Sequence, residues 1–250
     1  MIIFDEKKYA EKIIRFGYYQ TLQFLGKERR AVARYLKYDM GYSDYEITKA
    51  ITNIKSRKKE LYDDDVWENV MVKLLNGYDK SEYIKDYRVG ISQTELDIIL
   101  DQPTIELRNL LFVLLVYFKW ARNTKSRLCM RGTDTWVKEE DLDCCKIAGL
   151  NKLRKSERVD LFSILYKKGV YKSDFIRKYN NIFTLPFVDD KKPVIVIDDF
   201  TEIIAHLENY IDPNKCTHCI ECGALTYKTS NRQKACKMCS KNRKHCKIGV

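Results

Sequence analysis

The sequence predicts a mainly α-helical protein in three parts: a helical region over residues 1–90, a mixed α and β region over residues 91–211, and a small cysteine-rich module over residues 212–250. Apolar residues recur at three-to-four spacing through the first two regions, as in amphipathic helices. Only 4 prolines and 10 glycines occur in 250 residues, which leaves little room for disordered linkers. Six of the 9 cysteines fall after residue 212.

The first region contains strong helix-start and helix-stop signals. Ser43 and Glu46 form a capping box, which should open a helix that runs to about Lys59. The run Asp63–Asp65 places negative charge at the positive end of the next helix, and Gly77 is suited to end it. A charged first turn explains three aspartates better than a metal site does.

A second capping box, Ser92 with Glu95, starts a short helix that ends before Pro103. Residues 104–120 then form the most hydrophobic helix of the chain and the expected centre of a second core. Its longest apolar run, residues 110–118, is shorter than the roughly 18 residues that a membrane-spanning helix needs. We therefore interpret it as a core helix of a soluble protein.

The pattern between residues 136 and 197 changes from helices to short strands. A helix at about 138–147, opened by Trp136 and Val137, precedes a second helix at about 156–168. The β-branched runs Val170–Tyr171 and Val194–Ile197 then have the character of strands. Three helices followed by a two-stranded ribbon is the order of a winged helix-turn-helix, so we expect a winged-helix-like middle domain.

In a winged helix the second helix of the motif enters the major groove of DNA and the hairpin contacts the backbone. The predicted recognition helix is therefore 156–168, although it mixes acidic with basic residues and offers little for base readout beyond Arg158 and Ser163. A packing or protein-docking domain with a solvated charged face is the alternative. The candidate nucleic-acid contacts of this region are Arg158, Lys167, Lys168, Arg177 and Lys178.

The last segment carries a metal-binding signature of two Cys-x-x-Cys pairs. Such pairs with a short insert are typical of a zinc ribbon, in which four thiolates bind Zn2+ tetrahedrally. Thirteen residues separate the pairs, enough for a short hairpin through residues 224–232. The predicted ligands are Cys219, Cys222, Cys236 and Cys239.

The first pair has a rival, because Cys216 stands three residues before Cys219. We prefer Cys219 with Cys222, since Gly223 tolerates the positive φ that a knuckle needs, whereas Ile220 is β-branched. Disulfides are less favoured, because the charged start of the chain lacks a secretory signal and suggests a reduced, cytoplasmic setting. Four residues are left over for a second site or a substitute ligand: Cys216, His218, His245 and Cys246.

Charge favours an acidic partner. The formal net charge is +11, and nine basic against two acidic residues lie between positions 212 and 250. A metal-stabilised module this basic is suited to phosphate contact, although the same charges would also solubilise an exposed C-terminus. The candidate phosphate contacts of the tail are Lys237, Lys241, Arg243 and Lys244.

Signs of catalysis are few, and we predict a non-enzymatic protein. The sequence has no phosphate-binding glycine loop, no His-Glu-x-x-His and no nucleophile elbow. His206 stands alone on an expected helix at 202–210. The pairs Asp189–Asp190 and Asp198–Asp199 bracket a strand and could hold magnesium, but no catalytic lysine lies in clear register with them.

The tail resembles the C-terminal zinc ribbons of uncharacterised proteins from phages and mobile elements of low-GC Gram-positive bacteria. The resemblance rests on Cys-x-x-Cys-Gly at 219–223 and on Ser-Asn-Arg-Gln-Lys-Ala-Cys at 230–236, where Ala235 replaces the usual aromatic residue. Residues 146–169 look like the winged-helix part of such proteins. The resemblance implies a phage or mobile-element origin and a four-cysteine ligand set.

Together these features predict a zinc-stabilised protein that binds nucleic acid, with DNA favoured over RNA. The alternative is a phage-encoded factor that docks on a host nucleoprotein machine, such as RNA polymerase or a CRISPR effector, and inhibits or redirects it. Both functions would use a basic surface.

Overall fold

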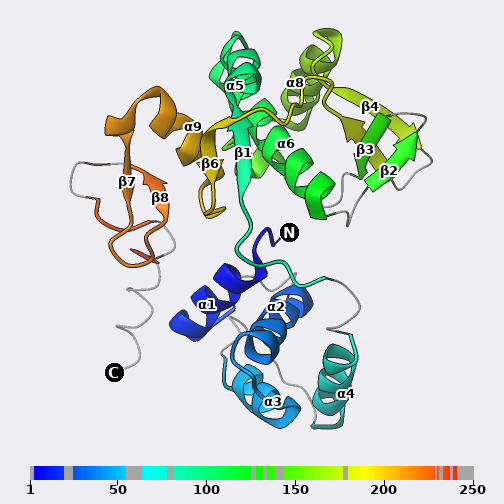
Figure 1. Ribbon diagram of the computed structural model, residues 1–250, viewed down its shortest axis with the longest axis vertical. Coiled ribbons are helices and arrows are strands. Elements are labelled where there is room, and N and C mark those ends of the chain that lie inside the picture. Colours follow the sequence, from blue (N-terminus) through cyan, green and yellow to red (C-terminus); the bar gives the residue numbers. More distant parts are fainter. Residues whose placement is uncertain are drawn as a thin grey trace. The chain divides into compact units, whose positions relative to one another are not determined.

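The computed structural model describes residues 3–19, 25–54, 64–77, 82–124, 128–131, 134–138, 144–176, 180–228, 230, 233–236 and 239–240. The described residues are mainly helical, with small sheets between the helices (Figure 1). The chain divides into two compact units, Ile3–Tyr87 and Arg88–Val250. No helix in the described part is both long enough and apolar enough to cross a bilayer.

The first unit is helical, and its core is made of aliphatic and aromatic side chains that include Ile13, Val32, Ile47 and Met71. The capping box is confirmed, because the Ser43 hydroxyl accepts from the Glu46 N–H while the Glu46 carboxylate accepts from the Ser43 N–H. The helices are α1 (Glu6–Phe16), α2 (Leu25–Tyr38), α3 (Asp44–Asn53) and α4 (Asp64–Leu75).

The predicted end of the helix that Ser43 caps was wrong, and part of the predicted start of the next helix lies outside the described residues. The helix that Ser43 caps ends at Asn53, not near Lys59, because Ile54 adopts an extended conformation and its N–H turns back to the Ile51 carbonyl. Residues 55–63, Asp63 among them, lie outside the described part of the chain. The helix α4 begins at Asp64 and stops before Gly77, whose N–H bonds to the Leu74 carbonyl at 3.1 Å.

The last segment of this unit is fastened to its first helices by charged groups. The buried Arg34 side chain donates to both carboxylate oxygens of Glu6 at 2.9 Å. Glu6 also exchanges backbone and carboxylate hydrogen bonds with Ile84, and Asp5 accepts from the Tyr87 N–H at 3.0 Å. These contacts explain why the unit continues to Tyr87.

The second unit is built around one long helix, α6, in which every residue from Leu110 to Ala121 is buried. The expected helix at 104–120 is thus confirmed and continues to Thr124. That helix is α6 (Ile105–Thr124). The other helices of this unit are α5 (Gln93–Leu100), α7 (Cys144–Ile147), α8 (Lys155–Lys167), α9 (Ile203–Ile211) and the 3-10 turn η3 (Pro213–Lys215).

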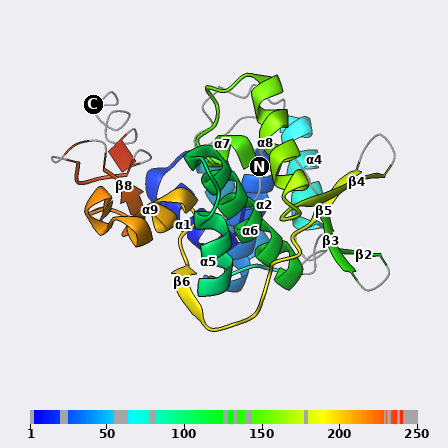
Figure 2. The same cartoon turned by 90° about the horizontal axis from the view of Figure 1, so that it is seen from above.

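Eight short strands form three antiparallel sheets among the described residues of this unit, in the orders β1-β6, β2-β3-β5-β4 and β7-β8. The four-stranded sheet and the β7–β8 hairpin lie on opposite sides of α6 in both views (Figure 1 and Figure 2). The strands are β1 (Val89–Ser92), β2 (Leu128–Arg131), β3 (Asp134–Lys138), β4 (Lys172–Ile176), β5 (Asn180–Thr184), β6 (Pro193–Ile197), β7 (Cys216–His218) and β8 (Leu225–Tyr227).

The predicted helix at 138–147 was wrong over its first part. Trp136 and Val137 belong to β3, where Val137 pairs with Leu128 on one side and Phe183 on the other. Their β-branched and aromatic character suits a strand, and the buried Val137 mimics a helical core position in the sequence. Only α7 at 144–147 is helical, and residues 139–143 lie outside the description.

The predicted two-stranded ribbon was wrong in its pairing. Residues 170–171 precede β4, and β4 pairs with β5 rather than with residues 194–197. The strand at 194–197 exists as β6, but it pairs with β1, more than a hundred residues earlier (Val89 opposite Ile197). Val89 and Gly90 therefore belong to the second unit rather than to the N-terminal region.

Aromatic packing attaches the four-stranded sheet to the helices. Phe183 of β5 is fully buried, and its ring lies 6.0 Å from that of Tyr117 and 5.9 Å from that of Phe118 on α6. Tyr171 stacks on the same Phe183 ring at 5.7 Å and also meets Phe162 of α8 at 5.5 Å. Such pairs stabilise by about 0.5–1.5 kcal/mol each beyond their buried area.

A buried ion pair crosses the centre of the unit. The Lys119 ammonium on α6 lies 2.7 Å from a Glu95 carboxylate oxygen and also donates to the Gly90 carbonyl at 2.7 Å. Glu95 accepts in addition from the N–H of Ser92 and from that of Asp189, both at 2.9 Å. Lys119 is 6% exposed and Glu95 is 0% exposed. One pair therefore joins α6, β1, α5 and the segment that leads into β6.

We predict that Lys119→Met destabilises the protein by about 3–5 kcal/mol, because it leaves the Glu95 carboxylate buried without its cation. The measurement is urea unfolding followed by circular dichroism and tryptophan fluorescence. The double variant Lys119→Met/Glu95→Gln should recover part of the loss, since no charge is then left unpaired.

The matched control is Arg154→Ala, which breaks an exposed pair with Glu157 whose atoms lie 3.1 Å apart. We expect that change to lower the free energy of unfolding by less than about 1 kcal/mol. If Lys119→Met and Arg154→Ala lowered the free energy of unfolding equally, the central role of the buried pair would be contradicted.

Candidate metal centre

The first cysteine pair lies in the turn that joins β7 to β8. The Cys219 N–H donates to the Ala224 carbonyl and the Gly223 N–H to the Cys219 carbonyl, both at 2.8 Å. Gly223 has a φ of +72°, the left-handed conformation expected from the sequence. The preference for Cys219 with Cys222 is therefore supported by the local backbone.

The second pair is held against the first by backbone hydrogen bonds. The Ile220 N–H donates to the Lys234 carbonyl at 3.0 Å, which brings the two chain segments together just before Cys236. The Cys239 N–H points at the Cys236 sulfur at 3.4 Å, and the Ser240 N–H donates to the Cys236 carbonyl at 2.9 Å. An N–H directed at a sulfur is typical of a thiolate knuckle.

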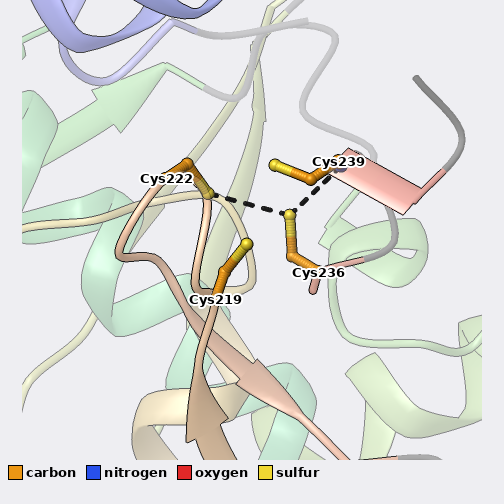
Figure 3. Close-up of side chains that lie close together, drawn as sticks. All are labelled: Cys219, Cys222, Cys236 and Cys239. Carbon is orange, nitrogen blue, oxygen red and sulfur yellow. Dashed lines mark hydrogen bonds between the residues drawn. The ribbon is translucent and has the colours of Figure 1, made fainter. Parts of the chain in front are cut away.

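The four predicted ligands converge, with all of their sulfurs within 4.8 Å of one another. Figure 3 shows the side chains of Cys219, Cys222, Cys236 and Cys239 pointing toward a common centre. The Cys222 and Cys236 sulfurs lie 3.8 Å apart. A tetrahedron with metal–sulfur bonds of about 2.3 Å has edges of about 3.8 Å. The four cysteines are thus positioned to bind one metal ion.

Burial makes this cluster unfavourable as four separate thiolates. Desolvation raises the pKa of the Cys236 thiol to about 11 and that of Cys239 further above its ordinary value. Burial also opposes ionisation of Cys219, but N–H groups of Cys236 and of residues 221–222 lower its pKa to about 7. A cation bound between the sulfurs would supply the charge that stabilises the thiolates.

The leftover cysteines serve other purposes where the structure describes them. The Cys216 thiol donates to the Ala205 carbonyl at 3.3 Å and packs in a small core with Ala205 and Leu225, and burial raises its pKa. His218 shares a hydrogen bond of 3.0 Å with the Gly223 carbonyl. Cys144 and Cys145 are buried, as expected of small core residues. His245, Cys246 and the side chain of Cys129 lie outside the described part.

The hairpin that carries the first pair is anchored on α9. The Glu202 carboxylate at the start of that helix accepts from the Thr226 hydroxyl at 2.8 Å and from the Tyr227 N–H at 3.1 Å. Residues 229 and 231–232 of the hairpin predicted at 224–232 lie outside the described part of the chain, and Leu225–Tyr227 forms β8, which pairs antiparallel with β7, Cys216 opposite Tyr227. Nothing local in the sequence marks Glu202 as the anchor, since its partners are more than 20 residues away.

The junction at Pro213 and Asn214 forms a short 3-10 turn. Asp212 caps it by accepting from the Asn214 N–H at 3.0 Å, and the Lys215 carbonyl accepts from the Lys228 N–H at 2.8 Å. The cysteine module is therefore continuous with α9 through hydrogen-bonded residues.

The candidate nucleic-acid residues are described only in part. Lys167 and Lys168 are exposed at the end of α8. Arg158 is half-buried, and its Nε has no hydrogen-bond partner among the described residues. The others lie outside the described part: Arg177, Lys178, Lys237, Lys241, Arg243 and Lys244.

Asp189, Asp190 and Asp199 each contact a different group, and the described aspartates do not gather around a common point. Asp189 accepts from the Lys191 N–H, Asp190 pairs with Arg122, and Asp199 accepts from Thr201. In the part of the chain that the structure describes, the four cysteines are the one group of metal-ligating side chains close enough to share an ion. His206 bonds to the Asp199 carbonyl at 2.9 Å, and its burial lowers its pKa.

Comparison of this chain with known protein families, with curated proteins and with solved structures finds no match.

We predict that Cys222→Ser loses bound metal, because a hydroxyl replaces one of four thiolates in a closed site. Elemental analysis of protein purified under reducing conditions should find less than about one tenth of the wild-type metal per chain. Cys216→Ser is the matched control, since that residue is buried outside the cluster and serine keeps a donor for the Ala205 carbonyl. Full metal content in Cys222→Ser would contradict the ligand assignment.

Proposed function

We propose that this protein is a non-enzymatic DNA-binding protein that presents α8 to duplex DNA from a winged-helix arrangement. The order of elements supports the proposal: α6, β3, α7 and α8 are followed by the β4–β5 hairpin, and β3 joins the hairpin beside β5. In winged helices, one strand before the helical pair adds to the wing in this way, and the last helix of the pair is left to face DNA.

The exposure of α8 is the observation that carries the proposal. Of its 13 residues, only Leu165 is buried. A helix that packs on a core along so narrow a stripe leaves most of its surface available to a partner. The stretch from Asn151 to Lys172 contains seven basic and two acidic residues, so this surface attracts phosphate.

We further propose that the cysteine centre binds zinc. Four thiolates in a closed tetrahedral set select zinc or iron, and such a site leaves no position for a reacting water. The role of the ion would be structural, which agrees with the hydrogen bonds that join the cysteine hairpin to α9. An ion with a purely structural role is compatible with a protein that binds DNA without catalysing a reaction.

A protein partner is the second candidate, favoured by apolar side chains on the same helix. Val159 is 55% exposed, Ile164 is 38% exposed and Tyr166 is 58% exposed. Exposed apolar residues on one helix favour a protein surface over a phosphate backbone. A host nucleoprotein machine could contact the apolar residues through its protein surface and the basic residues through its nucleic acid.

We predict that the protein binds mixed-sequence duplex DNA with an affinity that falls steeply as salt rises. The double variant Lys167→Gln/Lys168→Gln should reduce the log–log salt slope by about two, since each lost phosphate contact removes about 0.9 from it. Fluorescence anisotropy of a labelled duplex over a range of salt concentrations measures both quantities.

The matched control is Arg88→Gln, an exposed basic residue at the start of the second unit, which should leave the slope near its wild-type value. Absence of duplex binding at physiological salt, together with tight capture of one host protein after nuclease treatment, would overturn the proposal in favour of the second candidate.

A further inference from the structure

The outward side of α8 carries a row of polar side chains. Residues along one side of a helix recur at intervals of three or four positions, and the members of this row do so. Leu165, the one buried residue of α8, follows Ser163 by two positions, or about half a turn, so the row points away from the core. The members of the row, all exposed, are Ser156, Asp160, Ser163 and Lys167.

Asp160 is the unexpected member of this row, because DNA phosphates repel a carboxylate. The other acidic residue of α8 is neutralised within the chain. Glu157 lies 3.1 Å from the Arg154 guanidinium and accepts from the Arg154 N–H at 2.6 Å. In the part of the chain that the structure describes, no cation and no N–H group binds the Asp160 carboxylate. Its charge is therefore available to a partner.

Ser163, three positions after Asp160, is also a hydrogen-bond acceptor. Its hydroxyl donates to the Val159 carbonyl at 3.1 Å, so the oxygen lone pairs are what remains for a partner. An ionised carboxylate likewise accepts hydrogen bonds and donates none. The centre of the row is therefore suited to receive N–H donors.

Such a surface distinguishes bases by their amino groups. In the major groove, cytosine presents its N4 amino group, and adenine presents its N6 amino group beside the N7 acceptor. Guanine and thymine present acceptors, and thymine adds its methyl group. A carboxylate is repelled by acceptors, so it favours cytosine over the other three bases. The charge that weakens general attraction to DNA thus contributes selectivity.

The basic residues stand at the two ends of the helix rather than at its centre. Contacts with phosphate fix the position of a protein on the duplex, and contacts with base edges select the sequence. Charges at both ends would hold the helix in the groove while its centre faces the bases. The exposed lysines at these ends include Lys152 and Lys155 before the row, and Lys168 and Lys172 after it.

We propose that Asp160 is a base-recognition residue that selects cytosine, and that Ser163 accepts from an amino group of a neighbouring base pair. This inference rests on the proposed DNA-binding function and adds the class of sequence that the protein prefers. An unpaired carboxylate at the centre of a stretch with seven basic and two acidic residues, from Asn151 to Lys172, is the observation that carries it.

The test is selection from a duplex library with a random central block, followed by sequencing of the bound fraction. The wild type should enrich cytosine at one position. Asp160→Asn should change that preference to adenine, since an amide binds adenine N6 and N7 together. Asp160→Ala should lose the preference and bind the unselected library more tightly than the wild type, because a charge that phosphates repel has been removed.

Fluorescence anisotropy gives the size of the effect. The probes are the selected duplex and a copy in which the preferred C·G pair is replaced by T·A. The Kd of the wild type should differ between the two by about five-fold or more, and that of Asp160→Ala by less than about two-fold.

The control variant is Asp101→Ala, which removes an exposed carboxylate at the end of α5 and should leave the selected sequence unchanged. Circular dichroism of each variant confirms that the fold is kept. Salt-dependent duplex binding with a base preference that Asp160→Asn does not alter, or with no base preference, would overturn this inference and leave the proposed function standing. Absence of duplex binding at physiological salt would overturn both.

Discussion

The second unit depends on one buried charge pair. Lys119 sits in a helix that is otherwise surrounded by apolar side chains, and its ammonium group can be buried there only because Glu95 and the Gly90 carbonyl receive it. Glu95 in turn is oriented by the capping box at the start of α5 and by the Asp189 N–H. The pair thereby fixes the register of a two-stranded sheet whose strands are far apart in sequence.

The cysteine centre belongs to the same unit and is built on very short strands. Strands of three residues cannot form a stable hairpin alone. Here the hairpin has two supports: the cluster of four sulfurs at its turn, and α9 at its open end through Glu202 and the thiol of Cys216. A metal ion would therefore stabilise residues that contact the core, so we regard the centre as part of the unit.

Two elements of the second unit, α8 and β6, leave much of their surface exposed. The helix α8 is supported through Leu165 and through the contact of Phe162 with Tyr171, and its remaining surface is open. The strand β6 is supported by β1 and leaves two valines exposed. The aspartates at 189 and 199 and His206 form hydrogen bonds with neighbouring groups.

The sequence by itself determined the features that depend on near neighbours. The capping boxes at Ser43 and Ser92, the core helix α6 and the knuckle with Gly223 each rest on residues within a few positions, where spacing and backbone preference decide the outcome. The cysteine pairs 219/222 and 236/239 were predictable for the same reason, because each pair is separated by only two residues. Only the tertiary structure decided which strands pair, that Trp136 and Val137 are extended, and that Glu202 anchors the cysteine hairpin. Those outcomes depend on side chains that meet across the core, and local sequence patterns do not record which distant segment supplies the other half of a contact.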